Sequence, residues 1–183
     1  MPALTEFVRV PIDAAMRAHA RREGAARRIQ RTRASPIDAY IGVLGELVWA
    51  KLRYGNFSRL GVPGAKGQVD DVSPDAQIEV KTSKTKVHER AHLMVREDYA
   101  RARQPTAYVL VLIPEEQADG EEEAAFVCGW ATHEEVLHGH LQERLSRKTG
   151  AAQGYRCYEI AVRDLHPVEE LLSTLQRGAE AHE

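Results

Sequence analysis

The sequence has little of several features that mark whole classes of protein. Its two cysteines, Cys128 and Cys157, are too few for a disulfide framework or a four-thiolate metal cluster, and their apolar and aromatic neighbours predict reduced, structural thiols. No apolar run approaches the roughly 20 residues of a membrane helix. The N-terminus lacks the basic start and unbroken apolar stretch of a secretory signal, and it contains acids that transit peptides avoid. We therefore expect a cytoplasmic protein without membrane contact.

The charges are segregated along the chain, although the net charge is only -2. Residues 17–33 contain seven arginines and one acid, whereas residues 115–123 are strongly acidic. A basic segment of this kind is compatible with binding nucleic-acid phosphates, although a solvated helix face is the commoner explanation. The 183 residues, 43% of them hydrophobic, suffice for one domain with a real core. We predict an Arg-rich helical extension over residues 1–34 and one domain over residues 35–183.

Two helices are expected before the first strand. Residues 11–33 have the composition of a helix with a weak apolar stripe, which predicts a surface position. The next helix has clear boundaries, because Ser35 can cap its start, Pro36 suits its first position and Gly55 can end it. Apolar residues recur at helical spacing between Pro36 and about Tyr54, so this segment predicts an amphipathic helix. A loop rich in Gly and Pro follows and lacks the ending of a phosphate-binding loop.

The rest of the chain alternates between strand and helix patterns. We expect strands at 68–72 and 77–83 that are joined by a turn at 73–76, and further strands at 92–95, 107–113, 126–131 and 155–162. The strand at 107–113 is continuously apolar, so we expect it to be buried on both faces. We expect helices at 96–104, 132–148 and 167–177. This order predicts an α/β fold with a mixed central sheet flanked by helices.

The segment Gln77-Ile78-Glu79-Val80-Lys81 carries the strongest chemical signal. Side chains alternate along a strand, so Ile78 and Val80 point to one face while Glu79 and Lys81 point to the other. Charges on a central strand need a metal, a partner or a substrate, whereas on a solvated edge strand they would form only a surface ion pair.

Acidic residues nearby could join this pair. Asp70 and Asp71 precede the turn, and a two-residue loop sets Asp70 opposite Glu79, whereas one more loop residue or a bulge sets Asp71 there. Asp75, in the turn itself, is a third candidate. Upstream, Glu46 lies in an apolar helical run beside Gly42 and Gly45, which would allow a close approach of backbone or ligand. A lone helical Glu is otherwise usually solvent-facing.

Three features follow one another along the sequence: Glu46, then Asp70 or Asp71, then Glu79-Val80-Lys81. Together they resemble the signature of the PD-(D/E)XK, restriction-endonuclease-like nucleases, which consists of a helical Glu, an Asp on one strand of a hairpin, and E-x-K on the next strand. The resemblance covers roughly residues 37–113. It implies a restriction-endonuclease-like core and a magnesium-dependent endonuclease acting on DNA. Nothing in the sequence supports a homodimer, although one is compatible with it.

The resemblance also implies roles for the residues. Asp71 or Asp70, with Glu79 and the carbonyl of Val80, would bind Mg²⁺, or Mn²⁺ in its place, through oxygen ligands. Glu46 would complete that shell or hold a second ion through water, and Lys81 would orient or deprotonate the attacking water. The helix after the catalytic strand would add phosphate contacts from Arg96, Arg101, Arg103 and Gln104, unless these are merely surface residues.

Two other interpretations compete with this one. His133 and His138 are five residues apart and do not share a helix face, so they do not form a zinc-peptidase motif; Thr132 and Glu135 instead predict a capping box. The second alternative is a nuclease-like fold without catalysis that binds DNA or serves an assembly. The presence of all the expected catalytic residue types favours the enzyme.

Overall fold

The computed structural model describes residues 7–30, 35–59, 69–73, 76–85, 91–115, 122–145 and 150–180. The helices are α1 (Ala14–Gln30), α2 (Pro36–Tyr54), α3 (Glu97–Ala102), α4 (His133–His138) and α5 (Val168–Glu180), with 3-10 turns η2 (Phe57–Arg59) and η4 (Val162–Asp164). The strands are β1 (Val8–Pro11), β2 (Asp71–Ser73), β3 (Ala76–Thr85), β4 (His92–Arg96), β5 (Ala107–Pro114), β6 (Ala124–Thr132), β7 (His140–Leu145) and β8 (Ala152–Ala161). Asp75 lies outside the described residues.

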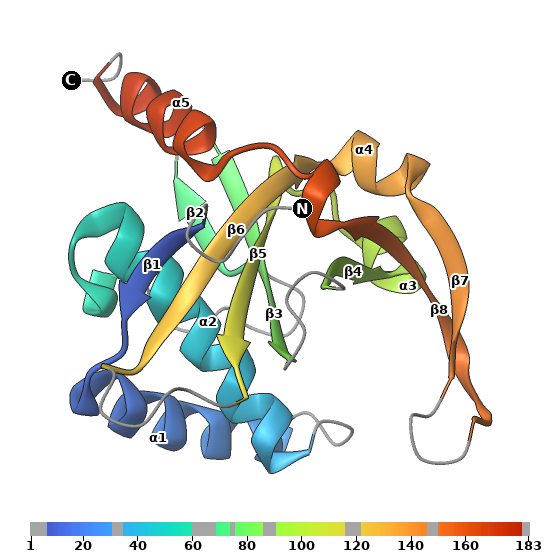
Figure 1. Ribbon diagram of the computed structural model, residues 1–183, viewed down its shortest axis with the longest axis horizontal. Helices are drawn as coiled ribbons and strands as arrows, with labels where there is room; N and C mark the ends of the chain where they lie inside the picture. The colour runs from blue at the N-terminus through green and yellow to red at the C-terminus, as the bar shows by residue number, and fades with distance from the viewer. Residues whose placement is uncertain are drawn as a thin grey trace.

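A curled five-stranded sheet with the order β1-β6-β5-β3-β2 forms the centre of the molecule (Figure 1). Strands β3 and β5 are parallel and the other neighbours are antiparallel, so the sheet is mixed. A second, antiparallel sheet has the order β4-β8-β7. The prediction of an α/β fold with a mixed central sheet and flanking helices is therefore confirmed.

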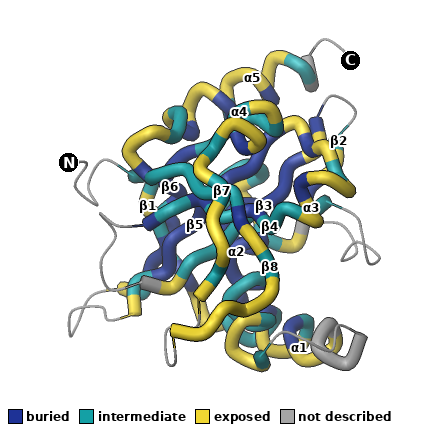
Figure 2. The backbone as a smooth tube through the Cα atoms, turned by 90° about the vertical axis from the view of Figure 1, so that its right-hand side faces the viewer, coloured by how far each residue is buried: buried dark blue, intermediate teal, exposed yellow. Residues whose placement is uncertain are grey.

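Strand β5 separates two hydrophobic cores, as its predicted burial on both faces requires. Seven of its eight residues are buried (Figure 2). Val109 and the other side chains on the same face of β5 pack with α1, α2 and α5. Tyr108 and Leu110, on the opposite face, pack with β4 and α3. Glu79 pairs in register with Tyr108, and Lys81 with Leu110, so both charges face the α3 side.

Helix α2 has the predicted boundaries. The Ser35 hydroxyl accepts a hydrogen bond from the Asp38 N–H at 3.1 Å, and Gly55 ends the helix with φ 69°. Its middle, Val43–Ala50, is buried all round because the sheet covers one side and α1 packs on another. Gly45 is needed at the crossing with β3, since a Cβ there would lie 1.8 Å from the Thr82 Oγ1.

The N-terminal segment is more closely integrated than its weak apolar stripe predicts. Residues 8–11 form strand β1 on β6, and α1 begins only at Ala14, where Asp13 accepts a hydrogen bond from the Met16 N–H at 2.9 Å. Met16 and Ala20 are fully buried in the core shared with α2. The described part of this segment is thus held by the main core and not laid on its surface.

One predicted helix is wrong in its second half. Residues 132–148 were expected to be helical, but α4 ends at His138 and residues 140–145 form β7, paired with β8. The first half gains a capping box, with Thr132 accepting from the Glu135 N–H. Gly139 has extended backbone angles, φ −65° and ψ 170°, which end the helix, and residues 140–145 then pair with β8, a partner that lies far along the chain.

Among the described residues, every helix is too short or too polar to cross a lipid bilayer.

Candidate active site

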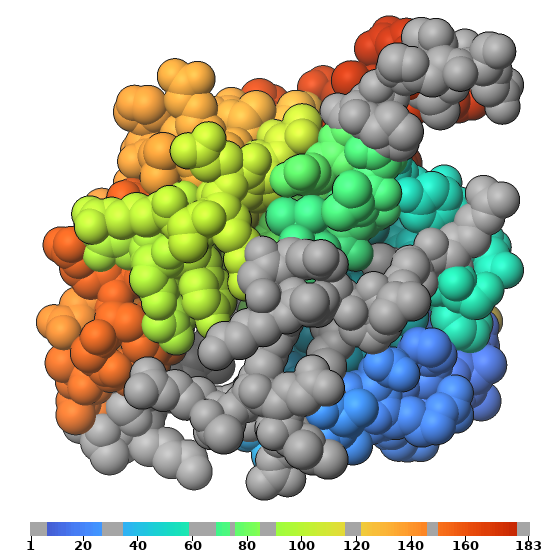
Figure 3. Space-filling model, turned by 180° about the vertical axis from the view of Figure 1, so that it is seen from behind, coloured from blue at the N-terminus to red at the C-terminus, as the bar shows by residue number. Residues whose placement is uncertain are grey.

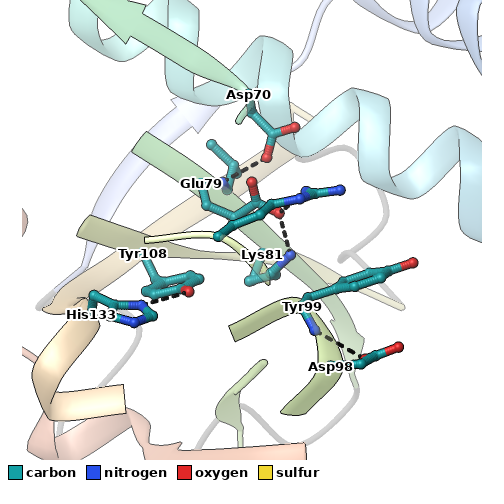
Figure 4. A network of polar contacts seen from close by, with 9 residues as sticks. Asp70, Glu79, Lys81, Asp98, Tyr99, Tyr108 and His133 are labelled. Carbon is teal, nitrogen blue, oxygen red and sulfur yellow. Dashed lines mark hydrogen bonds and ion pairs between the residues drawn. The ribbon is translucent and has the colours of Figure 1, made fainter. Parts of the chain in front are cut away.

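Glu79 and Lys81 form a close ion pair on the central strand β3. The Lys81 Nζ donates to the Glu79 Oε1 at 2.6 Å (Figure 4). The Glu79 side chain is 7% exposed and that of Lys81 is 22% exposed, so the lysine is the more accessible of the two. The predicted side-by-side arrangement is therefore present and largely buried, on a part of β3 that pairs with β5 on one side.

Asp70 lies beside this pair, directly before the start of β2. Asp71 is paired with Ile78, which places Asp70 level with Glu79, as the shorter of the two expected loops requires. The Asp70 Oδ2 accepts a hydrogen bond from the Val80 N–H at 2.8 Å, so a side chain takes the place of the partner strand there. The backbone of Val80 is thereby held next to both carboxylates.

The surroundings of Asp70 are unfavourable for its negative charge. Burial raises the pKa of this carboxyl well above its usual range, and the nearby carboxylates of Glu46 and Glu79 raise it further. Lys81 and the Val80 N–H act in the opposite direction but do not compensate. Three acidic side chains therefore share one region that is short of positive charge.

Glu79 has one engaged oxygen and one unengaged oxygen. Its Oε1 contacts Lys81 and also the Arg103 guanidinium, at 3.5 Å. Its Oε2 is fully buried and has no hydrogen-bond partner among the described residues. Buried carboxylate oxygens are almost always satisfied, so this atom marks a place where a cation or a donor would be stabilised.

Asp71 belongs to a different environment. It accepts hydrogen bonds from the Trp49 indole at 2.7 Å and the Tyr54 hydroxyl at 2.8 Å, and it pairs with Arg53. Its side chain is 5% exposed. These donors come from α2, so Asp71 ties the start of β2 to that helix and is turned away from Glu79.

Glu46 is not the solvent-facing residue that a lone helical glutamate usually is. It is 8% exposed, on the turn of α2 that crosses β3 at Gly45. Its charge acts on Asp70, as described above. The structure therefore brings Glu46, Asp70, Glu79 and Lys81 into one region and leaves Asp71 outside it.

The cations expected on α3 are present but largely paired. Arg96 binds Asp98 through two hydrogen bonds of 2.9 and 2.6 Å, and Arg101 pairs with Glu97 at 2.6 Å. Arg103 points toward Glu79, and Gln104 is exposed. Of the expected phosphate contacts, Arg103 is the one in contact with the site itself.

The sequence interpretation missed two tyrosines near the site. Tyr108 lies next to Glu79 on β5, and burial, followed by the Glu79 charge, raises its pKa to about 12. Its hydroxyl contacts the His133 Nδ1 at 3.2 Å. Tyr99 on α3 has the Lys81 Nζ 6.0 Å from its ring centre. The register of β3 with β5 could have identified Tyr108, which was counted only as part of an apolar run.

The histidines of the segment 133–140 lie in two separate places. His133 contacts Tyr108, whereas His138 and His140 line a separate cavity of about 470 Å³ between α4 and the second sheet. Within the described ranges, no three Asp, Glu, His or Cys side chains are grouped so that they alone would hold a metal ion. Cys128 and Cys157 are buried and free, and burial raises the pKa of both thiols.

Comparisons of the chain with protein-family models, with curated proteins and with solved structures gave no match.

Proposed function

We propose that this protein is a metal-dependent nuclease that hydrolyses phosphodiester bonds in DNA. The observation that carries the proposal is the state of Glu79: one oxygen is bound by Lys81, and the other is buried beside Asp70 with no hydrogen-bond partner in the part of the chain that the structure describes. A structural ion pair would be expected to satisfy both oxygens. The arrangement suits a site that is completed by a ligand.

The residues fit a hard divalent cation such as Mg²⁺ or Mn²⁺. Asp70 and Glu79 would hold it, with the carbonyl of Val80, and Glu46 would support it directly or through water. The crowded negative charge at Asp70 and the unpartnered Glu79 Oε2 both favour a cation there. Two carboxylates with water and substrate oxygens are a common ligand set for Mg²⁺, so a third protein ligand is not required. When bound, the ion would supply Lewis-acid activation of the phosphate and of water.

The chain's own residues would carry the remaining steps. Lys81 would orient the attacking water, whose proton would pass to bulk solvent, and the charge of its ammonium group would oppose the negative charge that develops on the phosphate. Arg103 would help to hold Glu79 in place, because its guanidinium contacts the same Oε1 as Lys81. Tyr108 stays protonated at neutral pH and closes the site beside Glu79.

The arrangement of elements supports a restriction-endonuclease-like core. A helix with an inward Glu, an antiparallel β2–β3 hairpin and a parallel β3–β5 pair with α3 between them occur in the order that the PD-(D/E)XK resemblance implies. This likeness is also what favours DNA as the substrate.

The alternative is an inactive subunit that binds DNA or serves an assembly. It is favoured by the pairing of both Lys81 and Arg103 with Glu79, which would also suit a purely structural centre. The unpartnered oxygen and the crowded charge at Asp70 argue against it, because a structural centre would have no reason to keep either.

The test is cleavage of plasmid, linear duplex and single-stranded DNA by the purified chain, with Mg²⁺ or with EDTA. We expect cleavage with Mg²⁺ that EDTA abolishes and that Lys81→Ala removes. Binding without cleavage under every condition would support the inactive subunit.

A further inference from the structure

A series of cation–aromatic contacts leads away from the candidate active site. Arg103, which contacts Glu79, lies 5.1 Å from the Tyr99 ring centre, and Arg96 lies 4.9 Å from the same ring. Arg96 is also 4.7 Å from the ring centre of Tyr155 on β8. The contacts therefore connect the site with the second sheet through α3. Figure 3 shows these segments side by side on one face of the molecule.

Hydrogen bonds hold two members of this series, Arg96 and Tyr155, and the neighbouring Arg156. Asp98 holds the Arg96 guanidinium through two hydrogen bonds, and Glu97 holds Arg156 through two of 2.8 Å each. Tyr155 donates a hydrogen bond to the Gln153 side chain at 2.7 Å. A surface that is ordered before a ligand arrives loses less side-chain entropy on binding.

The surface around α3 also exposes groups that can contact a ligand. Tyr99 is 43% exposed, so part of its side chain is open to a ligand. Away from the carboxylates of the site, the surface at α3 and β8 has three cations, Arg96, Arg101 and Arg156, paired with two carboxylates, Glu97 and Asp98. This part of the surface therefore has an excess of one positive charge, which favours a polyanion. Because carboxylates already occupy the hydrogen-bonding edges of Arg96 and Arg156, aromatic contact is the main interaction left.

We propose that Tyr99 and Tyr155, with Arg96 between them, bind unpaired bases of a single-stranded DNA segment next to the scissile phosphate. This inference rests on the proposed nuclease function and adds a substrate class to it. Bases can contact aromatic and guanidinium groups in this way only when they are not enclosed in a duplex, and such contacts tolerate any base sequence. The enzyme would thus act on single strands or at junctions between single and double strands.

Binding by the full chain in EDTA, followed by fluorescence anisotropy, tests the inference. The probes are three labelled DNAs of equal length: oligo-dT, the same backbone with abasic sites, and a duplex. We expect oligo-dT to bind roughly tenfold more tightly than the abasic strand, because the two share phosphates and differ in bases. Equal affinity for these two strands would overturn the inference without any variant.

Variants locate the binding site. Tyr99→Leu with Tyr155→Leu should lower the affinity for oligo-dT about tenfold and leave the abasic strand within twofold, whereas the two Phe substitutions should keep the affinity. Arg21→Ala with Arg22→Ala on α1 is the control, and should change the affinity for the dT and abasic strands by the same factor. If the Leu variant, shown to be folded by circular dichroism, binds oligo-dT like the wild type, the inference is wrong.

The two proposals can fail separately. Cleavage of duplex DNA with Mg²⁺, without preference for single strands, would support the proposed nuclease function and contradict the single-strand binding site. Tyrosine-dependent binding of oligo-dT without cleavage of any DNA would support the binding site and contradict the nuclease function.

Discussion

The adjacent residues Asp70 and Asp71 have the same chemistry and opposite surroundings. Asp71 is stabilised by the Trp49 indole, the Tyr54 hydroxyl and the Arg53 guanidinium. Asp70 has the Val80 N–H, and its pKa is raised by burial and by neighbouring carboxylates. Asp71 therefore stabilises the folded chain, whereas the ionised form of Asp70 costs stability until something positive is bound. Two adjacent residues therefore belong to two different regions: Asp71 to an anchoring region with Trp49, Arg53 and Tyr54, and Asp70 to a functional region with Glu46, Glu79 and Lys81.

The largest expected effect concerns the centre of the functional region. Lys81→Ala and Glu79→Ala should each lower the cleavage rate by roughly 10²–10⁴-fold, because each removes a group that acts on the reacting atoms. Lys84→Ala, an exposed lysine on the same strand, is the matched control and should cleave normally. Rates are measured on plasmid DNA with Mg²⁺, with circular dichroism to check folding. Turnover near that of the wild type in either variant would remove the assignment.

The next effect tests the two aspartates directly. Asp71→Asn should lower the free energy of unfolding by roughly 3 kcal/mol, because it leaves the buried Arg53 without its counter-charge. Asp70→Asn should leave stability equal or higher without metal and should remove most of the cleavage activity. Denaturant unfolding and plasmid cleavage measure the two quantities. Similar mild effects of both substitutions would show that the described hairpin register is wrong.

Glu46 should behave as a member of the functional region. Glu46→Gln keeps the shape of the side chain and removes its charge, so cleavage should fall strongly while stability without metal stays equal or rises. Thermal unfolding with and without Mg²⁺ checks this, since Mg²⁺ should stabilise the wild type more than the variant. A loss of roughly 3 kcal/mol would instead place Glu46 with the anchoring residues.

The smallest effect concerns the N-terminal arginines. Removal of residues 1–33 would also remove β1 and the buried Met16, so it would test stability and not binding. Arg21→Ala with Arg22→Ala is the cleaner change, because both residues are exposed. The slope of log affinity for duplex DNA against log salt should become about one to two units shallower if these residues contact phosphates. A slope like that of the wild type would show that α1 is only structural.

The sequence predicted those parts of the structure that depend on interactions between residues close together in the chain. The caps of α2, the alternation at Glu79 and Lys81 and the burial of β5 follow from neighbouring residues. The position of Asp70 depends on loop length, which left two registers open. Strand β7 and the place of Tyr99 depend on partners far along the chain, so residues 140–145 and this tyrosine were not recognised.

The contact between Gly45 and Thr82 makes two positions dependent on each other. Alanine at an interior helix position is ordinarily more stable than glycine by about 1 kcal/mol. Here its methyl group would overlap the Thr82 hydroxyl, whose buried oxygen has no hydrogen-bond partner among the described residues. Helix α2 would have to move off β3, and Glu46, the next residue, would move with it. In evolution or in engineering, a side chain at position 45 would therefore be acceptable only together with a smaller residue at position 82.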